Sequence, residues 1–149
     1  GIMIAIIIIY THTLVEGNSM DLIDDILGTS KNIAVVGISD KPNRESYRVA
    51  SYLKKVGYRI IPVNPSIEEV LGEVCYPTLR SIRGTVDVVD IFRRLDQVRY
   101  VVEEAIEISA RYIWMQDGLI DHIAAEKAFI AGIPTIMDNC IMREHRYRS

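Results

Sequence analysis

The chain has 149 residues, of which 49% are hydrophobic and 25% charged, the proportions of a soluble domain with a single core. Its 17 Lys and Arg residues and 20 Asp and Glu residues leave a formal net charge of −3, and such a chain lacks the positive field on which nucleic-acid binding depends. Cys75 and Cys140 form neither a CxxC metal knuckle nor a disulfide framework, so the sequence predicts a reducing, cytoplasmic setting and no metal.

Residues 1–19 form a leader that we treat separately from the domain at 20–149. Residues 2–9 are an unbroken apolar run, but this run is far shorter than the roughly 20 residues that a membrane-spanning helix needs. It also lacks the basic region and cleavage site of a signal peptide, so no membrane association is predicted. Two interpretations stay open: an additional strand that pairs with a sheet edge or a partner chain, and an extension preceding an alternative start at Met20.

From residue 20 onward, apolar runs typical of buried strands alternate with apolar residues at helical spacing. The predicted strands lie at 33–38, 58–63, 86–92, 112–115 and 135–137, with a further short strand within 70–76. The predicted helices lie at 22–27, 46–56, 97–108 and 122–131, with a terminal helical turn at 140–146. This alternation requires crossover connections. The predicted fold class is therefore α/β: a doubly wound, mostly parallel five-stranded sheet with helices on both faces.

The segments that follow the predicted strands are the candidate binding positions. In an open parallel sheet, ligands bind beyond the carboxyl ends of the strands, where the strand order reverses. This rule nominates the segments at 37–39, 63–65, 92–94, 115–118 and 138–140.

The first of these segments has the composition of a phosphate-binding loop. Gly37 permits a close backbone approach, and the helix that opens near Arg44 presents unpaired N–H groups to an anion. Lys41 and Arg44 add positive charge. The loop is not a dinucleotide fingerprint, because Ser39 and Pro42 stand where G-x-G-x-x-G requires glycine. The alternative interpretation is a plain strand–helix turn with two surface cations.

Seven sequence blocks in register carry a resemblance to a known family. The blocks lie at 34–39, 42–47, 57–65, 71–76, 86–94, 114–118 and 140–145, and include AVVGIS, GYRIIPVNP, VDVVDIFRR and WMQDG. Together they resemble the small stand-alone CoA-binding proteins, which are similar to the CoA-binding N-terminal domain of the succinyl-CoA synthetase α subunit. The resemblance covers about residues 20–148. It implies a Rossmann-like fold, coenzyme A at the switch point and no established catalytic activity.

The resemblance also implies roles for individual residues. At the pyrophosphate it places Gly37, Ile38 and Ser39, with Arg44 as the charge partner. Beside the adenosine it places Asn64 and Pro65. Phe92 and Arg93 would line the path between nucleotide and pantetheine, and Gln116 and Gly118 would contact the pantetheine arm. The position of the segments adds Lys41, Val63 and Cys140 to the predicted set. Asp117 departs from the pattern, since a neutral residue is expected there.

Cys140 follows the last predicted strand, at the edge where the arm of CoA would end. A thiol at this place would exchange into a mixed disulfide with CoA under oxidation; the alternative is an inert structural cysteine.

Three hypotheses for function remain. The first is a protein that binds CoA or acyl-CoA without catalysis of its own, with no catalytic residue and a possible homodimer as its assembly. The second is the nucleotide-binding subunit of an acyl-CoA synthetase. The third is an NAD(H)-sensing regulatory domain, against which the missing glycine and the missing acidic residue after the second strand argue, since Asn64 stands there.

Overall fold

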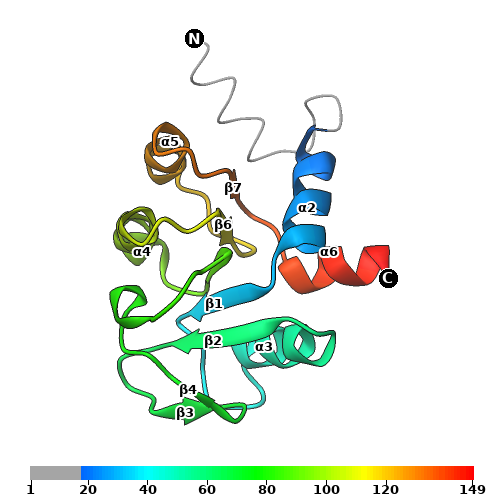
Figure 1. Cartoon of the computed structure of the whole chain (residues 1–149), viewed down its shortest axis with the longest axis vertical. Coiled ribbons are helices and arrows are strands. Elements are labelled where there is room, and N and C mark those ends of the chain that lie inside the picture. Colours follow the sequence, from blue (N-terminus) through cyan, green and yellow to red (C-terminus); the bar gives the residue numbers. More distant parts are fainter. Residues whose placement is uncertain (1–17) are drawn as a thin grey trace.

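The structure, a computed structural model, describes residues 18–149, and side chains from residue 22 onward; the strand predicted within the leader lies outside these residues. The predicted sheet of five parallel strands is confirmed, and its strand order is β2-β1-β5-β6-β7 (Figure 1). Their bounds are β1 Asn32–Val36, β2 Arg59–Val63, β5 Val88–Ile91, β6 Tyr112–Met115 and β7 Thr135–Ile136. The architecture is Rossmann-like α/β.

Helices cover both faces of the sheet, which a parallel sheet with crossover connections requires. Their bounds are α2 Asn18–Thr29, α3 Glu45–Lys55, α4 Leu95–Glu107, α5 His122–Ile130 and α6 Ile141–Arg148. The first apolar cluster packs α4 and α5 against one face, and the second packs α2, α3 and α6 against the other. No helix within residues 18–149 is long and apolar enough to cross a membrane.

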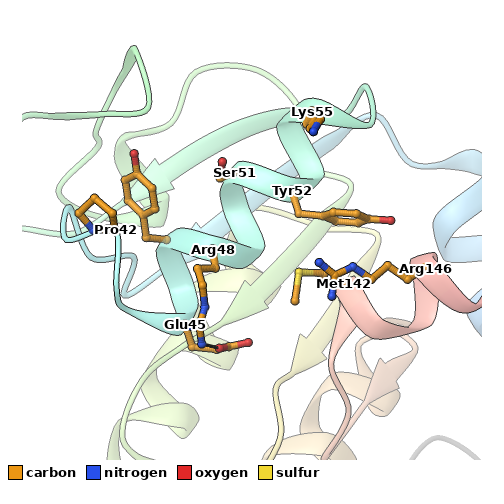
Figure 2. Close-up of a pocket in the computed structure, with 9 residues that line it drawn as sticks. Pro42, Glu45, Arg48, Ser51, Tyr52, Lys55, Met142 and Arg146 are labelled. Atoms are coloured by element: carbon orange, nitrogen blue, oxygen red, sulfur yellow. Dashed lines mark hydrogen bonds and ion pairs between the residues drawn. The ribbon is translucent and has the colours of Figure 1, made fainter.

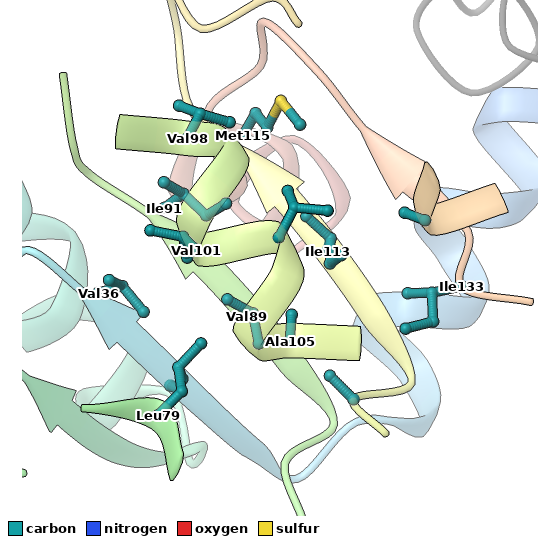
Figure 3. Close-up of a cluster of buried hydrophobic side chains, with 14 of the residues drawn as sticks. Val36, Leu79, Val89, Ile91, Val98, Val101, Ala105, Ile113, Met115 and Ile133 are labelled. Carbon is teal, nitrogen blue, oxygen red and sulfur yellow. The ribbon is translucent and has the colours of Figure 1, made fainter. Parts of the chain in front are cut away.

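The core under α4 and α5 shows why these segments form strands and helices. Alternate residues of each strand point to one face, so Val89 and Ile91 of β5 and Ile113 and Met115 of β6 face the same side. Val98, Val101 and Ala105 lie at helical spacing on α4 and pack onto them (Figure 3). The alternate residues of the strands and the helically spaced residues of α4 therefore form one buried layer.

Two local predictions need correction. The short strand within 70–76 is an antiparallel hairpin of β3 (Glu69–Val70) and β4 (Glu73–Val74), followed by the 3₁₀ turn η1 (Leu79–Ser81). Leu71 and Gly72 both have positive φ, which is the geometry of a two-residue type I′ turn. The terminal turn is a full helix, α6, because Arg148 binds both Asp24 of α2 (2.5 Å) and Glu144 (2.8 Å) and secures the end of the chain.

Candidate functional site

The strand order reverses between β1 and β5. From β1 the chain crosses to β2 on one side and later returns to β5 on the other, so the loops after β1 and β5 diverge at the carboxyl edge of the sheet. Crevices of this kind are where open α/β sheets bind their ligands.

Gly37 brings these two loops into direct contact. Its φ is +87°, and a Cβ at this position would lie 2.0 Å from the carbonyl oxygen of Phe92. The backbone N–H of Gly37 donates to Val63 (2.9 Å) and that of Phe92 donates to Val36 (2.8 Å). The floor of the crevice is therefore bare backbone, which only glycine allows.

The loop from β1 to α3 closes on itself through hydrogen bonds. The N–H of Ser39 donates to Ser46 Oγ (2.9 Å), and the N–H of Lys41 donates to Ser39 Oγ (3.1 Å). Arg44 is the N-cap residue of α3, and its side chain makes no capping bond. The helix start thus keeps N–H groups and the Arg44 guanidinium available at the crevice.

A cleft of about 380 Å³ opens in front of this helix start. Among its lining residues are six of the predicted set: Gly37, Ser39, Arg44, Phe92, Arg93 and Gln116. They come from the ends of β1, β5 and β6 and from the start of α3. The structure therefore brings together residues that are up to 79 positions apart in the sequence (Gly37 and Gln116).

A second, smaller cavity has a volume of about 170 Å³. Val63 and Pro65, both predicted, line it, and Gly37 and Arg93 line both cavities. Its remaining walls were missed by the sequence analysis: they include Pro77, Thr78 and the α4 residues Gln97, Tyr100 and Glu104. Tyr100 offered one signal in the sequence, because it is an aromatic residue outside the apolar spacing of that helix; in the structure it is 56% exposed.

The other predicted residues do not line these two cavities. Ile38 is fully buried, and its carbonyl accepts a bond from Asn64 Nδ2 (2.8 Å). Asn64 Oδ1 accepts from the N–H of Ser66 (2.8 Å), so this side chain fastens the loop after β2 to the loop after β1. Gly118 has a φ of +83°, and its N–H donates to Asp138 Oδ1 (2.8 Å). Lys41 is exposed.

Cys140 is the N-cap residue of α6 and is only 5% exposed. Burial raises the pKa of its thiol, against the opposing effect of backbone N–H groups of Arg143 and Met142. Only the thiolate attacks a disulfide, so this environment favours the inert structural cysteine over the reactive one.

Asp117, the departure from the expected pattern, is paired in a bidentate geometry. Arg143 Nη1 and Nη2 each lie 2.9 Å from one oxygen of its carboxylate. The hydrogen bonds from Arg143 hold the pKa of Asp117 below its usual value. The carboxylate at the rim of the cleft is therefore largely neutralised from α6.

Asp90 and Gln116 form a buried polar pair beneath the cleft. Asp90 lies in β5 with no exposed surface, and Gln116 Nε2 donates to its Oδ1. Burial raises the pKa of Asp90 to about 7, and the hydrogen bond from Gln116 opposes the shift.

A larger groove of about 570 Å³ lies elsewhere, between α3 and α6 (Figure 2). The guanidinium of Arg146 lies 5.1 Å from the ring centre of Tyr52, and Tyr52 Oη lies 2.6 Å from Nδ1 of His145. None of the predicted site residues lines it, although Glu45 lines both this groove and the cleft, so size alone does not select the site. Nor do the described residues include a cluster of three or more His, Cys, Asp or Glu side chains suited to a metal.

Comparison with known proteins decides the family. A family model described as a CoA binding domain matches residues 31–146, from the start of β1 into α6. The chain belongs to this family. The match confirms the resemblance carried by the seven sequence blocks, and it covers all five strands of the sheet.

The CoA binding domain has relatives of similar length. The Bacillus subtilis protein YneT is 44% identical over 123 residues, which cover 83% of this chain and 91% of YneT. A solved structure of a hypothetical protein from Pyrococcus horikoshii OT3 superposes with a TM-score of 0.85 at 39% identity, over 89% of this chain and 94% of that one. The alpha subunit of a Pyrococcus furiosus ADP-forming acetate–CoA ligase is 38% identical over 64 residues, 42% of this chain and only 14% of that subunit.

Proposed function

We propose that this CoA binding domain binds coenzyme A or an acyl-CoA in the two neighbouring cavities at the switch point, without a catalytic step of its own. The observation that carries the proposal is that Gly37 and Arg93 line both cavities, so the two cavities are neighbours between the start of α3 and α4. An elongated ligand with an anionic middle fits two neighbouring cavities with a cation between them.

Each part of CoA has a matching environment. The pyrophosphate would lie at the helix start, where Arg44, Arg93 and free N–H groups favour an anion. The adenosine would enter the smaller cavity, between Pro65 and Tyr100. The pantetheine arm would run past Gln116, with Gly118 and Cys140 farther along the same edge of the sheet.

The synthetase hypothesis has one observation in its favour, the similarity to the acetate–CoA ligase subunit. That similarity covers only 14% of the subunit, so most of the ligase subunit lies outside the match. The NAD(H) hypothesis still lacks an acidic residue after β2, since Asn64 stands there with both ends of its amide engaged.

A thermal-shift series on ligand-stripped protein tests the proposal. A ligand that binds only the folded state stabilises that state by about 2.7 kcal/mol when its concentration is a hundred times Kd. For a domain of this size, this stabilisation raises Tm by roughly 5–10 °C. We expect this shift with CoA, a smaller one with ADP, and little with NAD or NADP. A larger rise in Tm with NAD than with CoA would refute the proposal and favour the hypothesis of an NAD(H)-sensing regulatory domain. The proposed homodimer is checked by sedimentation velocity on the same samples.

A further inference from the structure

Asp90 is a carboxyl group placed in the middle of the sheet. Its neighbours in register are Val35 on β1 and Trp114 on β6. The indole N–H of Trp114 donates to the carbonyl of Asn139 (2.9 Å), so it is not available to Asp90. Within residues 18–149, the carboxylate accepts one hydrogen bond, from Gln116, and its Oδ2 is buried without a partner.

A buried carboxylate of this kind is costly, and an apolar residue would fill the position without the cost. Among the described side chains, those that the helices bury over this face carry no charge. The residues that they bury against the sheet are Ile23 and Ile26 of α2, Ser46, Val49, Ala50 and Leu53 of α3, and Ile141 of α6. Among the described residues, the pKa of Asp90 is raised by its burial and lowered by the hydrogen bond from Gln116, with no contribution from an ionisable side chain. The group therefore has a role other than stabilising the core.

Gln116 connects Asp90 to the cleft. It is 5% exposed and lines the cleft with Ser39 and Arg93. An ionised carboxylate only accepts hydrogen bonds, so it draws the NH₂ end of the amide toward itself. The amide oxygen is then left for the cleft. Within the described residues this oxygen accepts no hydrogen bond, and it is not one of the buried side-chain atoms that lack a partner.

We propose that Asp90 is a positioning residue for the ligand: in its ionised form it holds Gln116 with the amide oxygen toward the cleft, where it accepts an N–H from a secondary amide of the ligand. This inference rests on the proposed function, because the arm of CoA carries two such amides. Protonation reverses the arrangement. A neutral Asp90 can donate to the amide oxygen of Gln116, which turns the NH₂ end toward the cleft and replaces an acceptor by a donor.

The test measures how much Gln116 contributes to CoA binding as the pH changes. The Kd for CoA is determined by titration calorimetry for the wild-type protein and for Gln116→Ala, from about pH 6 to pH 8, across the pKa of Asp90. The ratio of the two Kd values is independent of the titration of CoA itself, because the same ligand is used on both sides. The same comparison of Gln116 with alanine is made in an Asp90→Asn background. It is also made with adenosine 3′,5′-bisphosphate, a ligand that lacks the pantetheine arm of CoA.

We expect Gln116→Ala to weaken CoA binding about three- to tenfold at the upper pH, the range of one hydrogen bond, and less at the lower pH. In the Asp90→Asn background the ratio stays constant with pH, and with the bisphosphate it stays near one. The inference is overturned if the Kd ratio does not change with pH when residue 90 is Asp. It is also overturned if the ratio changes with pH to the same extent in the Asp90→Asn background. Either result leaves the proposed function intact. Should Asp90→Asn not fold, the wild-type profile and the bisphosphate arm still decide. Failure of CoA to bind at any pH would instead refute the proposed function.

Discussion

The backbone carbonyl of Phe92 lies where a side chain on Gly37 would begin. The ideal Cβ of an alanine at position 37 would come within 2.0 Å of that oxygen and within 2.9 Å of Cδ of Arg93. This contact joins the loops after β1 and β5, which supply both walls of the crevice. The close approach and the positive φ both demand glycine.

Gly37→Ala should therefore destabilise the protein by about 3 kcal/mol or more, because the backbone must move as well as adopt a left-handed conformation. Gly132→Ala is the matched control, since Gly132 has a φ of +83° with no atom near its would-be Cβ, and it should cost only about 1–2 kcal/mol. Urea unfolding measures both. Equal losses would mean that the contact with Phe92 relaxes without cost.

Arg93 is the cation shared by the two cavities, and Arg44 stands at the start of α3. If the crevice holds CoA, replacing either residue by alanine should weaken binding by about 1.5–3 kcal/mol, the value of a hydrogen bond to a charged group. Arg111→Ala removes the same charge at the opposite edge of the sheet, before β6, and should change Kd little. Calorimetric affinity equal to wild type would remove the substituted arginine from the site.

The sequence predicted the sheet and the loops of the site because both follow from simple periodicities. Buried parallel strands are continuous apolar runs, and their carboxyl ends must share one edge. The walls contributed by α4 were not predictable in this way. Whether Gln97, Tyr100 and Glu104 face the smaller cavity depends on how α4 is rotated about its axis, and that rotation is set by packing of Val98 and Val101 on distant strands.

Asn64 and Asp90 illustrate a second limit. Asn64 follows a strand, as a ligand-binding residue would, yet both ends of its amide are used to fasten backbone. Asp90 interrupts an apolar run, which gave a signal, but only the structure identifies Gln116 as its partner. Sequence position selects the segment, and hydrogen-bond partners decide what each side chain does.

The pair of Asp117 and Arg143 should act on binding through charge. Arg143→Ala leaves the carboxylate of Asp117 uncompensated at the rim of the cleft, so CoA should bind about two- to fourfold more weakly at low ionic strength. The loss should disappear at high salt and in the double variant Asp117→Asn/Arg143→Ala. Stability should change by less than about 1 kcal/mol, since both side chains are 58% exposed. A loss of affinity that persists in the double variant would contradict a purely electrostatic effect.

Cys140 should be unreactive in the folded protein. Its burial and raised pKa leave little thiolate at neutral pH. In a Cys75→Ala background, a thiol reagent should label Cys140 slowly in buffer and rapidly in denaturant. Intact-mass analysis after incubation with CoA disulfide should find no adduct that reductant removes. An adduct at Cys140 would restore the mixed-disulfide hypothesis.

Asp90 should make stability depend on pH in the direction opposite to that of a salt-bridged carboxylate. Its pKa is about 7 in the folded protein, above the ordinary value, so between about pH 4 and pH 7 the folded state keeps a proton that the unfolded chain has released. The free energy of unfolding therefore falls as the pH rises through this window, and the cost is fully present above it. Asp90→Asn removes the ionisation.

The measurable quantity is the difference in the free energy of unfolding between Asp90→Asn and wild type, from urea unfolding at several pH values. This difference should grow in favour of the variant by about 1–3 kcal/mol between about pH 4 and pH 8. Asp25→Asn, at an exposed position on α2, controls for the loss of one negative charge. A flat profile for Asp90→Asn would mean that Asp90 ionises without cost, and that the carboxylate obtains solvation from the cleft through Gln116.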